Sequence, residues 1–79
     1  MGTDGQLLWR CRRGMRELDV LLTSYLDTRY AIAGAAERRA FESLLGLADP
    51  ELWAYVLSER VPSDPEMRHV IDRITSHSR

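Results

Sequence analysis

The sequence contains no lysine and only one cysteine, Cys11. A single cysteine excludes an internal disulfide and a cysteine-based metal cluster, and it is typical of a protein that does not depend on an oxidising compartment. No apolar run reaches the roughly 20 residues that a membrane-spanning helix needs. Residues 1–4 also lack the basic region and hydrophobic stretch of a secretion signal. We therefore expect a cytoplasmic protein with no direct membrane insertion.

The charge is nearly balanced, with a net value of −1 over 79 residues. No overall field draws such a chain onto nucleic acid or an acidic membrane. The composition, 44% hydrophobic and 29% charged, is typical of one globular domain, which we take to span residues 1–79. The two histidines, His69 and His77, are eight residues apart, too far for a joint metal site on one helix. We predict no metal site.

Apolar residues recur at intervals of three and four, which indicates amphipathic helices, and no useful stretch alternates as a strand would. We expect helices over residues 5–12 and 13–29, a third ending near Leu45, and two more that begin near Asp49 and Asp64. The fold class predicted is all-α, a small single-domain bundle of about five short helices.

Several residues are expected to start or end these helices. Asp4 is a candidate cap for the first helix, and Gly46 is placed to end the third in a left-handed conformation. Two identical triplets, Asp49-Pro50-Glu51 and Asp64-Pro65-Glu66, each offer a capping aspartate, a proline at the first helical position and an acid in the first turn.

The same periodicity predicts which side chains form the core. From residue 13 onward the expected core residues are Met15, Leu18, Leu21, Leu22, Tyr25, Leu26, Phe41, Leu44, Leu45, Leu52, Trp53, Val56, Leu57, Met67, Val70, Ile71 and Ile74. We also assign Trp9 to the core, with a place in an interface as the alternative. For Cys11 we favour a small buried apolar residue over a reactive thiol whose pKa is lowered by neighbouring arginines.

One charged stretch stands out at residues 12–19, Arg-Arg-Gly-Met-Arg-Glu-Leu-Asp. Gly14 lies in what reads as the first turn of the second helix, where glycine costs roughly 1 kcal/mol relative to alanine. Arg13 and Glu17 are four residues apart, and a pair in that order adds little stability. The stretch is either a solvated face with an ordinary glycine, or a surface that a partner's backbone approaches closely.

The segment from Trp9 to Asp19 resembles the signature of the FAD assembly factors of succinate dehydrogenase. These are the bacterial SdhE (YgfY) proteins, whose mitochondrial relatives are called succinate dehydrogenase assembly factor 2. The family pattern Arg-Gly-x-x-Glu is matched by Arg13, Gly14 and Glu17. Downstream, Phe41-x-x-Leu44-Leu45, Asp49-Pro50-x-Leu52 and Pro62-x-Asp64 follow in the family's order and spacing, so the resemblance covers about residues 7–75.

The resemblance implies a small helical chaperone that binds the flavoprotein subunit of succinate dehydrogenase, or of fumarate reductase, and promotes covalent attachment of FAD to it. Such a factor is not an enzyme, is expected to be a monomer, and binds no FAD tightly itself. The expected partner-binding residues are Arg13, Gly14, Glu17, Arg16, Arg12, Asp19, Val20 and Trp9.

Two other classes of function have less support in the sequence. The arginines near residues 10–16 could bind nucleic acid, but Glu17 and Asp19 interrupt the patch and the domain is not basic. An antitoxin-like interaction is the related alternative. An enzyme would need a nucleophile with a base, or paired carboxylates in a cleft, and the sequence presents neither.

Overall fold

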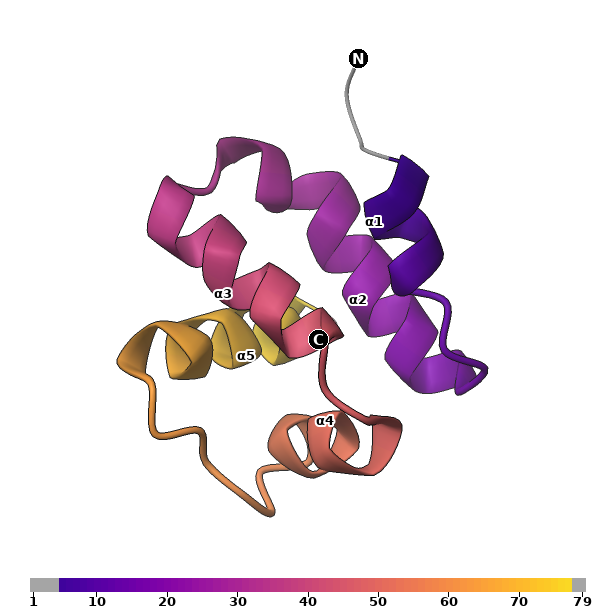
Figure 1. Ribbon diagram of the computed structural model, residues 1–79, viewed down its shortest axis with the longest axis vertical. Helices are drawn as coiled ribbons and strands as arrows, with labels where there is room; N and C mark the ends of the chain where they lie inside the picture. The colour runs from indigo at the N-terminus through magenta and orange to yellow at the C-terminus, as the bar shows by residue number, and fades with distance from the viewer. Residues whose placement is uncertain (1–4, 78–79) are drawn as a thin grey trace.

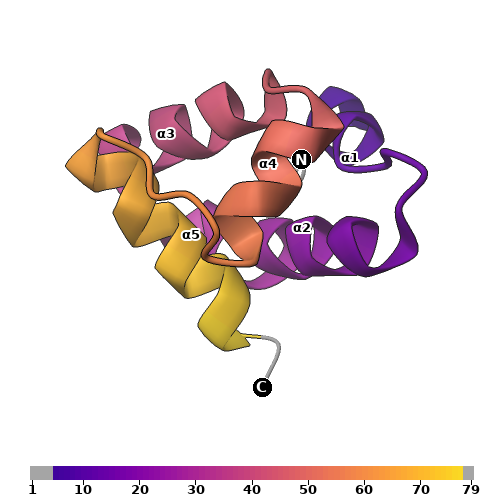
Figure 2. The same ribbon diagram turned by 90° about the horizontal axis from the view of Figure 1, so that it is seen from below.

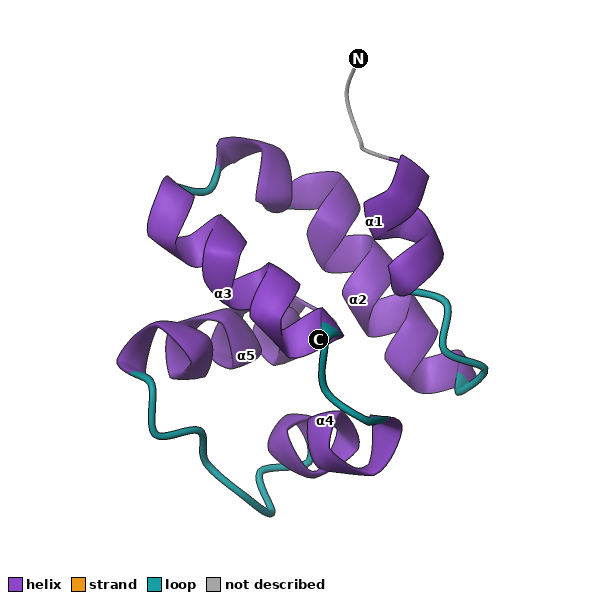
Figure 3. Cartoon of the chain, in the orientation of Figure 1, coloured by secondary structure: helices purple, strands orange, loops and turns teal. Residues whose placement is uncertain are grey.

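The computed structural model describes residues 5–77 of the chain. It contains five α-helices and one short 3₁₀ segment: α1 (Gly5–Arg10), α2 (Arg16–Thr28), η1 (Tyr30–Ile32), α3 (Ala35–Leu45), α4 (Asp49–Val56) and α5 (Pro65–His77) (Figures 1 and 3). No strand occurs among these residues. The predicted all-α class is confirmed. The capping role predicted for Asp4 lies outside the described residues.

The last helix, α5, is the element on which α2, α3 and α4 pack. It contacts α2, α3 and α4, and Figure 2 shows it lying obliquely across the ends of α2 and α3. Its start is as predicted, because the Asp64 carboxylate accepts a hydrogen bond from the Glu66 backbone N–H at 3.0 Å. Pro62 lies in the preceding loop, and its side chain is buried.

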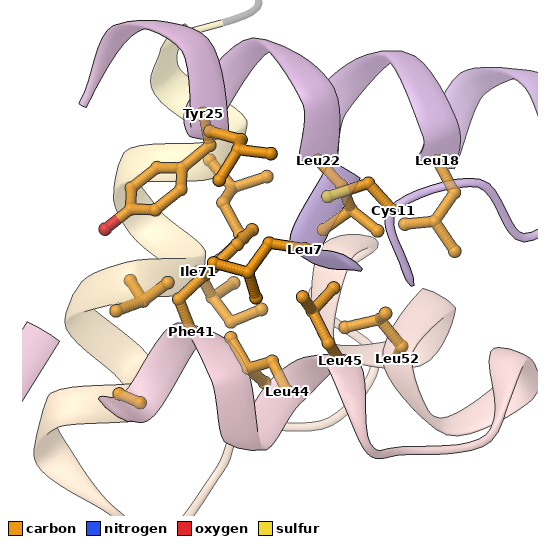
Figure 4. Close-up of a cluster of buried hydrophobic side chains, with 14 residues drawn as sticks. Leu7, Cys11, Leu18, Leu22, Tyr25, Phe41, Leu44, Leu45, Leu52 and Ile71 are labelled. Carbon is orange, nitrogen blue, oxygen red and sulfur yellow. The ribbon is translucent and has the colours of Figure 1, made fainter. Parts of the chain in front are cut away.

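The core gathers side chains from all five α-helices, as Figure 4 shows. Tyr25 and Phe41 pack against each other in this core, with ring centroids 4.6 Å apart and ring planes tilted by 34°. The Tyr25 hydroxyl reaches the edge of the core and donates a hydrogen bond to Glu37 at 2.5 Å. The buried apolar residues are Leu7, Cys11, Leu18, Leu22, Tyr25, Leu26, Ala40, Phe41, Leu44, Leu45, Leu52, Val70, Ile71 and Ile74.

Two of the predicted core residues are exposed. Trp9 is 75% exposed and Leu57 is 47% exposed. Trp9 lies on the outer side of α1, whose inward positions are taken by Leu7 and, just beyond the helix, Cys11. Leu57 falls outside its helix, because α4 ends at Val56 and Ser58 then adopts a positive φ of 63°. Trp53, Val56 and Met67 are partly buried.

The second helix begins later than predicted. It starts at Arg16 rather than residue 13, so residues 11–15 form a loop between α1 and α2. Gly14 lies in that loop with φ +87°, a conformation that residues with a side chain rarely adopt. The glycine is therefore not a costly residue inside a helix; it permits the loop. The late start also removes the predicted neighbouring positions of Arg13 and Glu17 on one helical face.

The loop is fixed to the far side of the core by the Arg13 side chain. Its Nε donates to Asp49 at 2.6 Å, its Nη1 donates to the Leu45 carbonyl at 2.9 Å, and its Nη2 donates to the Leu47 carbonyl. Arg13 is 13% exposed and Asp49 is 38% exposed. These contacts join the α1–α2 loop to the end of α3 and the start of α4.

Two predictions of helix ends in this region are wrong. Asp49 does not cap α4, because its carboxylate pairs with Arg13 and the cap position falls on Ala48. Gly46 does not turn left-handed, since it has φ −82° and ψ −8°. The connection instead continues in a right-handed turn, in which the Gly46 N–H donates to the Ser43 carbonyl and the Leu47 N–H to the Leu44 carbonyl.

Cys11 is a buried titratable group of the core. Its side chain is fully buried, and burial raises the pKa of the thiol from 9.0 to about 11, against the smaller lowering effects of Arg13 and Arg10. The interpretation of Cys11 as a buried apolar residue is confirmed, and the low-pKa thiol is wrong. Burial, and next the hydrogen bond to Glu37, also raises the pKa of Tyr25 above its ordinary value.

We predict that Arg13→Ala lowers the free energy of unfolding by about 2–3 kcal/mol, because it removes hydrogen bonds from a charged donor to three partly buried acceptors. Urea unfolding measured by circular dichroism tests this. The matched control is Arg12→Ala, an exposed neighbour that should change stability by less than about 0.5 kcal/mol. Equal effects of the two variants would contradict the structural role of Arg13.

We also predict that stability falls as the pH rises above 9. Below pH 9 the thiol is protonated in both the folded and the unfolded chain, so its contribution is intact. Between pH 9 and 11 only the unfolded chain releases the proton, and about 1 kcal/mol should be lost by pH 10. Tyr25 should add to the loss above pH 10. In the Cys11→Ala variant, the free energy of unfolding measured from pH 8 to 10 should change much less than in the wild type. If the variant loses stability as steeply as the wild type over this range, the assignment to Cys11 is contradicted.

Candidate functional site

The α1–α2 loop and the first turns of α2 carry most of the residues predicted to bind a partner. The loop conformation is held by Asp19, which projects back from α2. Its Oδ1 accepts a hydrogen bond from the Arg13 N–H at 2.7 Å, and its Oδ2 accepts one from the Gly14 N–H at 3.3 Å. Two successive loop amides are thus bound by one carboxylate, which also lies near the positive end of the α2 dipole.

Gly14 is exposed at this loop. A Cβ atom built on it would meet no other atom within 4 Å, so the space above its backbone is open. The requirement for glycine here comes from the positive φ and not from crowding inside the chain. A partner can therefore approach the bare backbone from outside.

Three charged residues of the predicted site are exposed around Gly14, namely Arg12, Arg16 and Glu17. Val20, one turn after Glu17 on α2, is 60% exposed. By contrast, the side chains of Arg13 and Asp19 are held by contacts within the chain. The structure thus separates the stretch into residues that shape the loop and residues that the loop presents.

A polar pocket of about 310 Å³ lies on one side of the loop, where α1 approaches the α3–α4 connection. Arg13 is paired with the Asp49 carboxylate, whereas Arg10 donates a hydrogen bond to the uncharged Glu42 carbonyl at 3.2 Å. The positive charge of the basic side chains in the pocket is therefore only partly neutralised. The pocket is lined by Trp9, Arg10, Arg12, Arg13, Leu45 and Asp49.

A second, more apolar groove of about 450 Å³ lies where α2 passes α4 and the end of α5. Sequence reasoning missed it because Leu57 and Trp53 were assigned to the core by their spacing, and no local signal shows that α4 stops at Val56. The groove is lined by Glu17, Val20, Leu21, Trp53, Val56, Leu57 and Thr75.

The remaining polar residues form no metal site in the described part of the chain. No group of three or more histidine, cysteine, aspartate or glutamate side chains among residues 5–77 is arranged to hold an ion. His69 accepts a hydrogen bond from Arg73 Nε at 3.2 Å, and its Nε2 lies 3.6 Å from Glu37. Within the described region, no helix is long and apolar enough to cross a bilayer.

Comparisons with known proteins agree with the sequence resemblance. The family model Sdh5, described as "Flavinator of succinate dehydrogenase", matches residues 5–78. The chain is 46% identical over 67 residues to a protein of Methylococcus capsulatus named FAD assembly factor SdhE, an alignment that covers 85% of this chain and 81% of the relative.

Proteins with the same name from two other bacteria are also similar. The relative from Colwellia psychrerythraea is 39% identical over 69 residues, which cover 87% of this chain and 76% of the relative. The relative from Pectobacterium atrosepticum is 34% identical over 71 residues, which cover 90% of this chain and 81% of the relative. With a family match over nearly its whole length, the chain belongs to the family of flavinators of succinate dehydrogenase.

Proposed function

We propose that this chain binds the flavoprotein subunit of succinate dehydrogenase and promotes the covalent attachment of FAD to it. The observation that carries the proposal is the family match over residues 5–78, supported by relatives named FAD assembly factor. The flavoprotein of fumarate reductase is a second expected client, because some members of the resembled family serve it.

The docking surface we propose is the face formed by Arg12, Gly14, Arg16 and Glu17. The exposed backbone of Gly14 allows close approach, Glu17 can accept hydrogen bonds from a basic residue or a backbone amide, and the arginines can bind carboxylates through forked contacts. Asp19 and Arg13 contribute by holding the loop in shape. Trp9 and Val20 extend the surface on its two sides.

In this proposal the chain is not an enzyme. The reacting groups are a histidine of the flavoprotein and the flavin, and the assembly factor holds the flavoprotein in a conformation that is competent for attachment. Because a rigid loop loses little conformational entropy on docking, the internal hydrogen bonds of residues 13, 14 and 19 favour binding. We propose that the factor acts as a monomer.

Binding of nucleic acid is a weaker proposal for the same face. Arg13, one of the four clustered arginines, is already paired with Asp49, and Glu17 and Asp19 lie among the others. This arrangement reduces the local positive charge available to phosphates.

We predict that Gly14→Arg abolishes flavinylation of the partner while the helical fold survives. Any side chain at residue 14 is strained by the positive φ, but it meets no other atom within 4 Å in the free protein, so its bulk obstructs an approaching partner. The measurement is in-gel flavin fluorescence of the flavoprotein in a deletion strain that expresses each variant. Gly14→Asn is the matched control, because asparagine tolerates positive φ better than other side chains and adds less bulk.

Normal covalent flavin with Gly14→Arg would show that this surface does not dock. An independent variant, Glu17→Ala, should also reduce flavinylation strongly and leave the melting temperature nearly unchanged, since Glu17 is exposed. Glu59→Ala, which removes another exposed glutamate far from the loop in sequence, should leave flavinylation unchanged. Equal flavinylation by the two glutamate variants would contradict the role given to Glu17.

We further predict that the isolated chain does not bind free FAD tightly. The sequence contains no glycine-rich phosphate loop of the kind that holds dinucleotides. Isothermal titration of the purified protein with FAD should give no saturable binding in the low micromolar range. A low-micromolar dissociation constant, lost in Arg12→Ala, would contradict this expectation and place a cofactor site at the loop.

A further inference from the structure

The groove where α2, α4 and α5 meet is mostly apolar and is open to solvent. Val20 is 60% exposed and Leu57 is 47% exposed, and these two line the groove together with the partly buried Trp53 and Val56. Exposed apolar side chains are common singly, but here they converge on one cavity of about 450 Å³, and contiguous apolar patches of this kind are typical of interaction surfaces.

The groove has one charged residue in its lining, Glu17. Its carboxylate is exposed, and no hydrogen bond or ion pair of this side chain is found within residues 5–77. An apolar groove with a single carboxylate at its edge is complementary to an apolar side chain accompanied by a cation. A partner without the cation would leave the carboxylate desolvated and unpaired when it covers the groove.

The groove is also continuous with the docking loop. Glu17 belongs to both, and Val20 and Leu21 follow it by three and four residues, so the three lie on adjacent positions of one face of α2. A partner segment that passes over Gly14 and contacts Glu17 therefore reaches Val20 and the groove within about one helical turn.

We propose that this groove is a second docking surface, which receives one large apolar side chain of the flavoprotein flanked by an arginine or lysine that pairs with Glu17. The inference rests on the proposed function, because the flavoprotein is the occupant. It adds that recognition has two parts, a bare backbone at Gly14 and an apolar anchor between α2 and α4. Anchors of this kind, seated in pockets and surrounded by polar contacts, supply a large share of binding energy in protein interfaces.

The test measures the affinity of the full chain for flavoprotein purified from a strain that lacks the assembly factor. Val20→Asp and Leu57→Asp should each weaken binding at least about tenfold, because an anchor worth 1.4 kcal/mol or more is lost. Ile32→Asp is the matched control: Ile32 is 77% exposed on η1, outside the groove, and its replacement should leave the dissociation constant within about twofold. Circular dichroism verifies the fold of each variant, and Val20→Gln replaces Val20→Asp if the latter unfolds.

A second measurement, ¹⁹F NMR of Trp53, reports directly on whether the groove is occupied. With 5-fluorotryptophan incorporated at Trp9 and Trp53, and the resonances assigned with Trp9→Phe, the Trp53 ¹⁹F resonance should shift or broaden when unlabelled flavoprotein is added. Glu17→Gln should weaken binding and reduce its dependence on salt, because the ion pair with the partner's cation is removed.

The outcomes separate this inference from the proposed function. If Gly14→Arg abolishes binding but Val20→Asp and Leu57→Asp bind like the wild type, the groove is not an interface, while the docking loop stands. If the wild-type chain does not bind the flavoprotein, both proposals fail. If the groove variants change only self-association, measured by light scattering, the occupant is a second copy of this chain and the inference is overturned.

Discussion

The shape of the α1–α2 loop depends on the contacts of the Arg13 guanidinium. The guanidinium is bound by the Asp49 carboxylate and by the Leu45 and Leu47 carbonyls, and it thereby joins the α1–α2 loop to the α3–α4 connection. Asp19 fixes the same loop from α2 through two backbone amides. Because the middle of the loop is held through Arg13 and the Gly14 N–H, Gly14 can keep a positive φ while its outer face stays open.

Most helices could be predicted from the sequence because their apolar spacing is regular and the core is formed by that spacing. Phe41, Val70 and Ile74 are buried as the pattern required. Helix ends were less predictable, and the two Asp-Pro-Glu triplets show why. Asp64 caps α5, whereas Asp49 begins the same three residues and is instead paired with Arg13, a residue 36 positions away. Local sequence carries no information about that competing partner.

The structure divides the residues of the predicted site in a way that the sequence did not indicate. Sequence patterns placed Arg13 and Glu17 together on a helix, yet the helix begins only at Arg16 and the two side chains serve different purposes. The arginine stabilises the connection between two loops, and the glutamate remains exposed beside an apolar groove. The Arg-Gly-x-x-Glu pattern thus combines one residue that builds the loop, one that permits its shape and one that faces outward.

The central claim is that the α1–α2 loop and the adjoining face of α2 are the surface that meets the flavoprotein. Amide hydrogen exchange of the chain, measured by mass spectrometry with and without the flavoprotein, tests this most directly. The account predicts added protection over residues 12–21 and 53–57, with none over residues 30–38, which include η1 and the start of α3. Protection confined to residues 30–38, with residues 12–21 unchanged, would contradict it.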